Sequence, residues 1–306
     1  MAAVPTHLRD LVDEVHDAVS CGESVAINGR STRTILDHEH SGRVADRVVS
    51  APSGVFEFQP DEMTVRCGAG TTLGELDAVL AAHSQYVNLP GTGTVGGALA
   101  RGWTSVDRLG RGPVRDVPLE SLLVDHRGRL IRLGGPTVKN VTGFDLLRVT
   151  VGALGTLGFF GELTLRTRPR AIDSRWFTLD DVDVRRLTEI HTGLYRPSSV
   201  LWDGRRVWIH LEGHPADIDD TVARLGLDTT DEPSTPPHRW SMSPAAALQF
   251  ELSPGDMVEV GVGLVHRREP APPRPTPVLD VHRRLDEEFD PDRRLNPQIR
   301  RFGDGA

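Results

Sequence analysis

Three clusters of glycine contain the residue types that could bind a phosphorylated or planar ligand. The first cluster follows a short apolar stretch and reads Asn28-Gly29-Arg30-Ser31-Thr32-Arg33. Successive backbone amides in such a turn form a concave anion site, and the arginine, serine and threonine side chains add further donors. No Gly-Lys-Ser/Thr follows, which excludes a Walker-type phosphate loop. An ordinary strand-to-loop turn is an equal alternative for this cluster alone.

The second cluster covers residues 90–102 and holds five glycines. Glycine at this density costs conformational entropy on folding, so we expect it where backbone passes close to a bulky ligand. The Thr94 hydroxyl and the amides of residues 95–98 are predicted to bind a diphosphate or ring carbonyls. A flexible loop is the alternative, but Val95, Ala98 and Leu99 would anchor the segment to a core. The predicted ligand contacts are Pro90, Gly93, Thr94, Gly96, Gly97, Ala100 and Gly102.

The third cluster reads GGPTVKNVTGFDL from Gly134 and continues as VGALGTLGFF to Phe160. It is neither a dinucleotide-binding GxGxxG nor a nucleophile elbow. It contains Lys139, the single lysine among 35 lysine and arginine residues, beside Asn140, one of only four asparagines. Because an ammonium and a guanidinium are not interchangeable at a tight site, Lys139 is predicted to pack where arginine cannot. Chance survival of one codon is the alternative.

Other residues that could do chemistry are isolated. His38 and His40 form one pair and His210 and His214 another, but solvated or incidental histidines are the preferred interpretation, and no metal site is predicted. The chain has two cysteines, Cys21 and Cys67. They could form one disulfide, but reduced thiols are expected because no secretory signal precedes them. Two cysteines are too few for an iron–sulfur cluster.

Apolar periodicity and turn residues predict the elements that must position these clusters. Thr72 and Glu75 have the spacing of a capping box, which predicts a helix start. The predicted helices cover residues 7–19, 72–82, 181–193, 216–225 and 278–289. The predicted strands cover residues 24–27, 55–59, 63–67, 119–125, 129–133, 160–168, 175–179, 199–202, 207–212 and 257–264. Residues 269–277 hold five prolines and are expected to be extended.

Length and composition narrow the class of protein. A chain of 306 residues suggests two domains. The sequence pattern changes after Pro169, which predicts a domain boundary near residue 170. The 43 acidic residues exceed the 35 basic ones, giving a net charge of -8, which argues against binding to nucleic acid. There is no run of 18 apolar residues, so no transmembrane segment is expected.

The third cluster resembles the hallmark of the FAD-binding fold of the vanillyl-alcohol-oxidase type, also called the PCMH type. Within that family, the chain is most similar to the FAD-binding subunit of bacterial glycolate oxidase. Further matching segments occur in order at residues 28–31, 65–76, 94–100, 112–116 and 289–297. The resemblance covers residues 24–170 and 285–297.

The resemblance implies an α+β fold with a two-lobed PCMH-type FAD-binding domain over residues 1–170. A smaller C-terminal α+β cap domain would cover 171–284, and the segment 285–306 would return to the first domain. It also implies that the diphosphate of FAD lies on residues 28–33 and that 93–102 pass near the flavin and ribityl chain. Residues 152–161 would contact the cofactor from the second lobe. The implied cofactor contacts in the third cluster are Lys139, Asn140, Gly155, Gly158 and Phe160.

Three departures from the family pattern change what it implies. Relatives with covalent flavin carry a histidine in the first loop, where this chain has Arg30, so FAD is expected to be non-covalent. Phe144 replaces a tyrosine and removes a phenol from any acid–base role. The cap lacks the clustered histidines and acid of catalytic 2-hydroxyacid dehydrogenases, so catalytic residues are left unassigned.

The implied function is that of an FAD-binding subunit of a glycolate oxidase-like complex, whose flavin accepts or relays electrons from a 2-hydroxy acid. The implied partners are a larger catalytic flavoprotein subunit and an iron–sulfur subunit. The expected location is cytoplasmic, with peripheral attachment to the membrane through those subunits. One alternative is a stand-alone FAD-dependent oxidoreductase on another alcohol or hydroxy acid, and another is a non-catalytic flavin-holding subunit. The cations that could bind a substrate carboxylate are Arg101, Arg108, Arg111, Arg115, Lys139 and Arg148.

Overall fold

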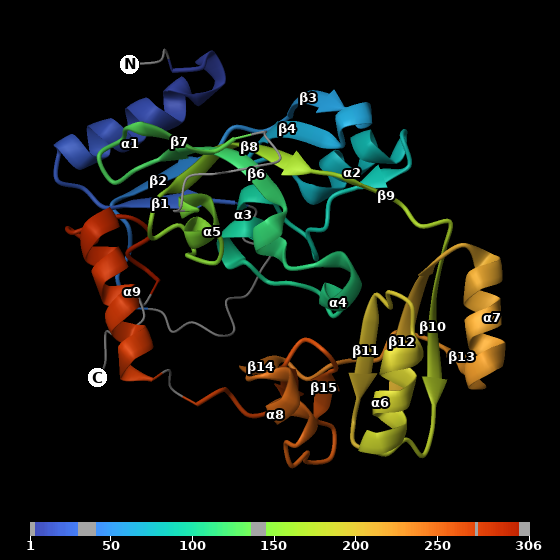
Figure 1. Ribbon diagram of the computed structural model, residues 1–306. Coiled ribbons are helices and arrows are strands. Elements are labelled where there is room, and N and C mark those ends of the chain that lie inside the picture. The colour runs from blue at the N-terminus through green and yellow to red at the C-terminus, as the bar shows by residue number, and fades with distance from the viewer. Residues whose placement is uncertain (1–3, 30–40, 136–144, 273–274, 300–306) are drawn as a thin grey trace. The chain divides into compact units, whose positions relative to one another are not determined.

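The chain divides into two compact units in a computed structural model that describes residues 4–29, 41–135, 145–272 and 275–299 (Figure 1). Unit 1 takes the described residues of 1–103, 114–169 and 274–306, and unit 2 takes those of 104–113 and 170–273. The sequence predicts residues 104–113 within the first domain and 276–284 within the cap. The structure groups residues 104–113 with unit 2, where Val106 packs against Leu201 and Met257. It groups residues 276–284 with unit 1.

A five-stranded antiparallel sheet with the order β3-β4-β8-β6-β7 forms the centre of unit 1. Its strands are β3 (Val55–Gln59), β4 (Thr64–Gly68), β6 (Pro118–Val124), β7 (Leu130–Gly134) and β8 (Phe159–Arg166). The strands predicted at residues 119–125 and 129–133 are confirmed, and they pair directly as the hairpin β6–β7. Val65 and Leu163 of this sheet pack with Leu80 of α2 (Leu73–Ala81) and Leu99 of α3 (Val95–Arg101), and all four are at most 1% exposed.

A smaller layer of unit 1 contains helix α1 (Arg9–Ser20) and the parallel strands β1 (Val25–Asn28) and β2 (Arg47–Ser50). The apolar stripe predicted for residues 7–19 is buried at Leu11 and Val15, against Phe159 and Leu295. The sequence did not indicate β2, because Val49 is its only buried side chain and no alternation marks it.

The helix start predicted at Thr72 is confirmed. The Glu75 amide donates to Thr72 Oγ1 at 3.1 Å, and the Thr72 amide donates to Glu75 Oε2 at 2.9 Å. These reciprocal bonds satisfy two amides at the start of α2 (Leu73–Ala81). The remaining elements of unit 1 are η1 (Thr6–Leu8), η2 (Pro60–Glu62), β5 (Gln85–Tyr86), α3 (Val95–Arg101), η3 (Val114–Asp116), α5 (Leu146–Thr150), β9 (Arg168–Pro169) and α9 (Thr276–Phe289).

Unit 2 is built on a seven-stranded antiparallel sheet with the order β13-β10-β12-β11-β15-β16-β14. Its elements are α4 (Arg108–Arg111), β10 (Asp173–Leu179), α6 (Val184–Gly193), β11 (Ser199–Trp202), β12 (Val207–Gly213), α7 (Pro215–Leu225), β13 (Asp228–Thr230), β14 (His238–Ser241), α8 (Pro244–Leu248), β15 (Met257–Glu259) and β16 (Leu264–Arg267). Strand side chains alternate between faces. Phe177 and Ile209 therefore join the core that includes Leu187 of α6, while Trp176 and Trp208 lie on the other face with Leu201.

Two segments differ from their predicted structure. Residues 257–264 form all of β15, a turn and the first residue of β16 instead of one strand, because Gly261 and Gly263 take positive φ values of 79° and 83°. Residues 95–101 form helix α3 within the glycine-rich second cluster.

Cys21 is exposed, Cys67 is buried, and the two are not joined by a disulfide. Burial and the nearby Glu162 charge raise the pKa of the Cys67 thiol to about 12, which keeps it protonated at neutral pH. Within the described part of the chain, no helix is both long enough and apolar enough to cross a bilayer.

Candidate functional site

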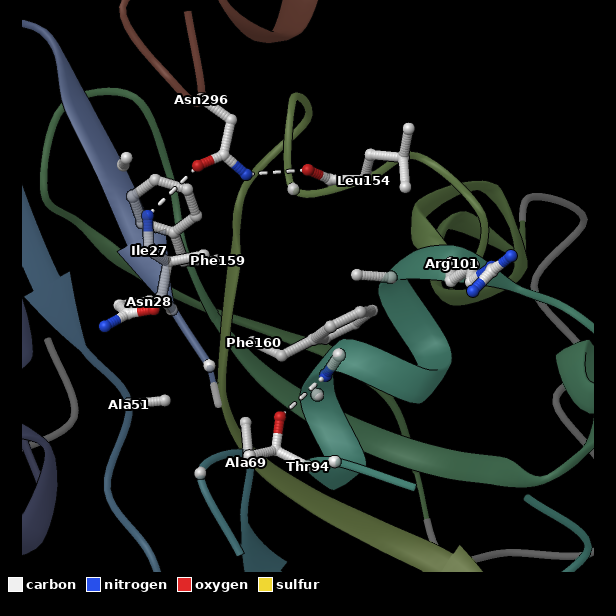
Figure 2. Close-up of a pocket in the computed structure, with 18 of the residues that line it drawn as sticks. Ile27, Asn28, Ala51, Ala69, Thr94, Arg101, Leu154, Phe159, Phe160 and Asn296 are labelled. Carbon is white, nitrogen blue, oxygen red and sulfur yellow. Dashed lines mark hydrogen bonds between the residues drawn. The ribbon is translucent and has the colours of Figure 1, made fainter. Parts of the chain in front are cut away.

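Unit 1 contains a cavity of about 540 Å³, which we call the unit 1 cavity (Figure 2). The segments that line it are far apart in the sequence and include the end of β1, helix α3, the loop at residues 154–158 and residues 296–299. Half of its 22 lining residues are glycine or alanine. Small side chains on several walls leave a space into which a large ligand can enter between backbones.

The side chain of Asn296 connects two walls of the cavity. The Ile27 amide donates to Asn296 Oδ1 at 3.0 Å, and Asn296 Nδ2 donates to the Leu154 carbonyl at 2.6 Å. The Asn296 backbone amide also donates to the Val25 carbonyl at 2.8 Å. Asn296 is 5% exposed and has a φ of 45°, a left-handed conformation in which asparagine is among the best-tolerated residues. It therefore fixes strand β1 relative to the 154–158 loop.

Helix α3 is capped by Thr94, whose Oγ1 accepts a bond from the Gly97 amide at 3.2 Å. The sequence predicts that the amides of residues 95–98 bind a ligand, but the protein itself uses them. The Val95 and Gly96 amides donate to the carbonyls of Thr71 and Ala69, and the Ala98 amide donates to the Thr94 carbonyl. The start of α3 therefore forms part of the cavity wall, and its amides bond to other parts of the chain instead of to a ligand.

Close contacts within the protein explain why two of the predicted glycines are glycine. A Cβ at Gly96 would lie 2.8 Å from the Ala69 side chain, where α3 packs on the segment after β4. Gly155 has a φ of 73°, and a Cβ there would lie 2.5 Å from Asn296 Nδ2. Both contacts are shorter than packed carbon and nitrogen atoms allow, so these glycines let the cavity walls approach each other.

Charge is scarce in the cavity. Arg101 is the one charged side chain among its described lining residues. Its guanidinium carbon lies 4.1 Å from the centroid of the Trp103 ring. Gln298 Oε1, also in the lining, is buried and has no hydrogen-bond partner. A ligand that carries negative charge and a hydrogen-bond donor would satisfy both groups.

The structure brings ten of the predicted ligand contacts into this lining, namely Asn28, Gly29, Gly93, Thr94, Gly96, Gly97, Ala100, Gly155, Gly158 and Phe160. Pro90 and Gly102 are not among the residues that line it. Six predicted contacts lie outside the described residues, namely Arg30, Ser31, Thr32, Arg33, Lys139 and Asn140. His38, His40 and Phe144 also lie outside them.

Sequence reasoning did not place Asn296, Gln298 or Arg101 among the cofactor contacts. Asn296 had two signals, because asparagine is scarce in this chain and Asn296 falls in a motif segment. Arg101 was one of several cations that could bind a carboxylate. Gln298 had no signal, since its role depends on burial alone.

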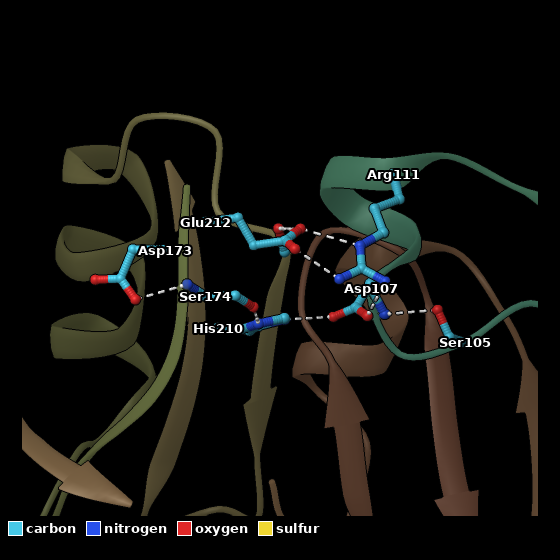
Figure 3. Close-up of polar contacts among 8 residues, drawn as sticks. Ser105, Asp107, Arg111, Asp173, Ser174, His210 and Glu212 are labelled. Atoms are coloured by element: carbon cyan, nitrogen blue, oxygen red, sulfur yellow. Dashed lines mark hydrogen bonds and ion pairs between the residues drawn. The ribbon is translucent and has the colours of Figure 1, made fainter. Parts of the chain in front are cut away.

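A second polar cluster lies wholly within unit 2 and is called here the unit 2 network (Figure 3). His210 of β12 is 5% exposed, and its Nδ1 lies 2.7 Å from Asp107 Oδ1. Its Nε2 lies 2.8 Å from Ser174 Oγ of β10, and its ring stacks on Trp176 at 4.7 Å. Because a carboxylate only accepts hydrogen bonds, Nδ1 carries the proton that faces Asp107.

A bidentate ion pair completes the unit 2 network. Arg111 Nε and Nη2 donate to Glu212 Oε2 and Oε1 at 3.0 and 2.6 Å, and Ser198 Oγ donates to Glu212 Oε2 at 2.6 Å. Burial would raise the pKa of Glu212, but the bonds from Arg111 and Ser198 outweigh it and lower the pKa below its ordinary value. Together with the His210–Asp107 contact, this pair attaches the 104–113 segment to strand β12.

The order Ser174, His210, Asp107 has the distances of a hydrolytic triad but lacks a donor for an oxyanion. The Ser174 amide already donates to Asp173 Oδ1 at 2.8 Å. The His210 and His214 pair does not form a metal site either, because His214 Nδ1 accepts a bond from the Ala216 amide at 3.3 Å at the start of α7. No group of three or more potential metal ligands occurs among the described residues. The network is therefore a set of mutually satisfied groups.

Comparison with known proteins identifies relatives for the part of the chain that forms the cavity. Residues 1–134 match a family described as FAD binding domain. Glycolate oxidase subunit GlcE of Escherichia coli is 28% identical over 224 residues, which are 71% of this chain and 63% of GlcE. D-lactate dehydrogenase of Archaeoglobus fulgidus is 38% identical over 39% of this chain and 27% of its own length. Glycolate oxidase subunit GlcD of Bacillus subtilis is 30% identical over 38% of this chain and 26% of GlcD.

The fold also has a solved counterpart. A structure of alkyldihydroxyacetonephosphate synthase matches 94% of this chain and 74% of its own, with a TM-score of 0.67 and 14% sequence identity. At that identity the match concerns the fold alone. The chain spans a little under two thirds of GlcE and about a quarter of the other two curated relatives.

Proposed function

Residues 1–134 match the FAD binding domain family, and from this match we propose that the chain is the FAD-binding subunit of a complex that oxidises a 2-hydroxy acid such as glycolate. The unit 1 cavity is the single observation that carries the proposal. Its walls come from the matched residues together with the 154–158 loop and residues 296–299. This is the one candidate site in which both the family match and the geometry favour a large cofactor.

The residues of the cavity fit FAD in size and chemistry. Its volume of about 540 Å³ falls within the roughly 300–1,000 Å³ of small-molecule sites. Glycine and alanine on opposite walls leave room for a flat ring, and Gln298 Oε1 offers an unused acceptor to a ring or hydroxyl donor.

The roles of individual residues follow from their position. Asn28 and Gly29 lie at the end of β1, so the diphosphate is proposed to bind there and along residues 30–33. Ala100, Phe160 and the glycines of the 154–158 loop would contact the ring system. Bound flavin supplies two-electron oxidation of a carbon next to a hydroxyl. The chain's own residues bind and orient the cofactor and exclude water from it.

The substrate and partners are proposed from the named relatives. GlcE and GlcD are both named as subunits of glycolate oxidase. Other relatives, which match over 37–39% of this chain, are named as dehydrogenases of D-lactate and D-2-hydroxyglutarate. We therefore assign a 2-hydroxy acid as substrate and a larger catalytic flavoprotein subunit as partner. Because the chain has two cysteines, an iron–sulfur subunit is the proposed route for onward electron transfer.

Purified full-length chain tests the proposal. It should carry FAD or take it up, and anaerobic glycolate or D-lactate should bleach the flavin only after the larger flavoprotein and iron–sulfur subunits are added. Acetate, which has the carboxylate but no hydroxyl, is the matched control and should not bleach it. Bleaching by the chain alone would favour a stand-alone oxidoreductase. A colourless protein that does not take up FAD would overturn the proposal.

A further inference from the structure

Arg101 is the last residue of α3 and the one charged side chain in the described lining of the unit 1 cavity. Trp103 holds the guanidinium by stacking at 4.1 Å, which fixes its position without neutralising its charge. Two of the other candidate cations have acidic partners among the described residues: Arg148 pairs with Asp116 and Asp145, and Arg111 pairs with Asp107 and Glu212. No ion pair found among the described residues involves Arg101, and the other candidates are not in the described lining of the cavity.

Arg101 is partly buried, and a partly buried cation without a counter-charge favours a ligand that supplies one. Phe160 and Leu154 line the same cavity, and the protein supplies no acidic side chain to its described lining. Removing a charge from water without a partner costs free energy, and an opposite charge on the ligand recovers it. Arg101 therefore selects a ligand with an anionic group.

FAD has an anionic diphosphate and a ring that becomes anionic on reduction, and the length of α3 distinguishes the two groups. A Cβ at Gly29 would lie 3.2 Å from Thr94 Oγ1, so the end of β1 meets the N-terminal end of α3. Figure 2 shows Arg101 at the opposite end of that helix, next to the loop that carries Leu154. Seven residues at 1.5 Å each separate the two ends by about 10 Å. With the diphosphate at Asn28 and Gly29, Arg101 would lie at the far end of α3, on the side of the cavity left for the ring.

We propose that Arg101 is a flavin-tuning residue that stabilises the negative charge which reduction places on the flavin ring, and so raises the reduction potential of the bound cofactor. This inference rests on the proposed FAD site. Uptake of two electrons and one proton leaves the ring with one negative charge. In turnover the hydroxy acid supplies these electrons, and in the test below a chemical titrant supplies them.

A potentiometric titration of the full chain loaded with FAD tests the proposal. Arg101→Gln should shift the equilibrium between reduced and oxidised flavin about tenfold toward the oxidised form, which for a two-electron couple corresponds to a potential lower by about 30 mV. Arg101→Lys keeps the charge and should recover part of the shift. Arg166→Gln removes an exposed arginine outside the cavity and should leave the potential unchanged.

The affinity for FAD separates the two anionic groups. With the ring as partner, the dissociation constant of oxidised FAD should be similar in Arg101→Gln and the native chain at low and high salt. An unchanged potential in Arg101→Gln overturns the proposal, and so does a salt-dependent loss of FAD affinity without a change in potential, which would assign Arg101 to the diphosphate. If the native chain binds no FAD, the proposed function itself fails, which is a different result.

Discussion

The unit 1 cavity and the unit 2 network differ in how their charges are matched. In unit 2, Arg111 contacts both Asp107 and Glu212, and Asp107 also contacts His210. In the described lining of the cavity, Arg101 is the single charged residue and stacks on an aromatic ring. Charged groups that satisfy one another hold chain segments together, whereas a charge without a partner indicates a ligand. The comparison assigns stability to the unit 2 network and cofactor binding to the cavity.

Asp107→Ala should have the largest effect on stability. It removes the buried carboxylate that contacts both His210 and Arg111, and we expect the free energy of unfolding to fall by about 4 kcal/mol. Urea denaturation would measure this change, and the affinity for FAD should stay the same. Asp180→Ala is the matched control, because it removes the partner of Arg206 in an exposed ion pair of the same unit and should have a much smaller effect. Equal costs for the two variants would contradict the structural role of the network.

Gly155→Ala should damage the cavity walls. The new Cβ would meet Asn296 Nδ2 in a backbone conformation with positive φ, and we expect a loss of about 3 kcal/mol. Because the strain falls on a cavity wall, FAD affinity should fall as well, measured by fluorescence quenching of added flavin. Gly74→Ala is the control, since a Cβ there has no atom within 4 Å. Undiminished FAD binding by Gly155→Ala would show that this wall does not contact the cofactor.

Asn296→Ala should have a smaller effect of the same kind. It removes the bonds to the Ile27 amide and the Leu154 carbonyl, which we expect to cost about 2 kcal/mol. Release of β1 from the 154–158 loop should weaken FAD binding by about tenfold, equivalent to 1.4 kcal/mol. Thermal unfolding with and without FAD would separate the two effects. A variant that loses stability but gains as much from FAD as the native chain would place Asn296 outside the site.

Acid should weaken the unit 2 network through Glu212. The bonds from Arg111 and Ser198 hold its pKa in the folded chain below the ordinary value of 4.5, so the carboxylate binds protons more readily when the chain is unfolded. Its contribution to stability is therefore complete above that ordinary value and is lost as the pH falls through the lower folded value. Glu212→Gln should be less stable than the native chain at neutral pH, and the difference should shrink as the pH falls below 4.5. Thermal unfolding from pH 7 to pH 3 measures it, and a constant difference would contradict the assignment.

Much of the fold could be predicted because its signals are local. Thr72 and Glu75 satisfy each other's amides three residues apart, and the stripe of α1 repeats within one helix. Segments that depend on distant partners were missed or misread. Strand β2 exists through its pairing with β1, and α3 forms in a glycine-rich segment because Gly96 packs against Ala69. Residues 257–264 read as one strand, since periodicity does not distinguish a continuous strand from a turn between two glycines.

The same division holds for the candidate site. The motifs, together with the family resemblance that they carry, selected ten residues that line the cavity, and the resemblance supplied the cofactor class. It did not select Asn296, whose partner Leu154 is 142 positions away in the sequence. It also gave no reason to prefer Arg101 to the other cations, because the presence or absence of a counter-charge depends on which side chains fold beside it.

The sequence by itself determined the glycine-rich motifs, the resemblance to an FAD-binding family and most helix and strand positions. These depend on residue type and on contacts between near neighbours. Only the tertiary structure decided that the amides of α3 are used by the protein, that Asn296 joins two walls, and that Asp107 and His210 pair across 103 residues. The physical reason is that burial and hydrogen-bond partners are properties of the folded chain, set when distant segments exclude water from one another.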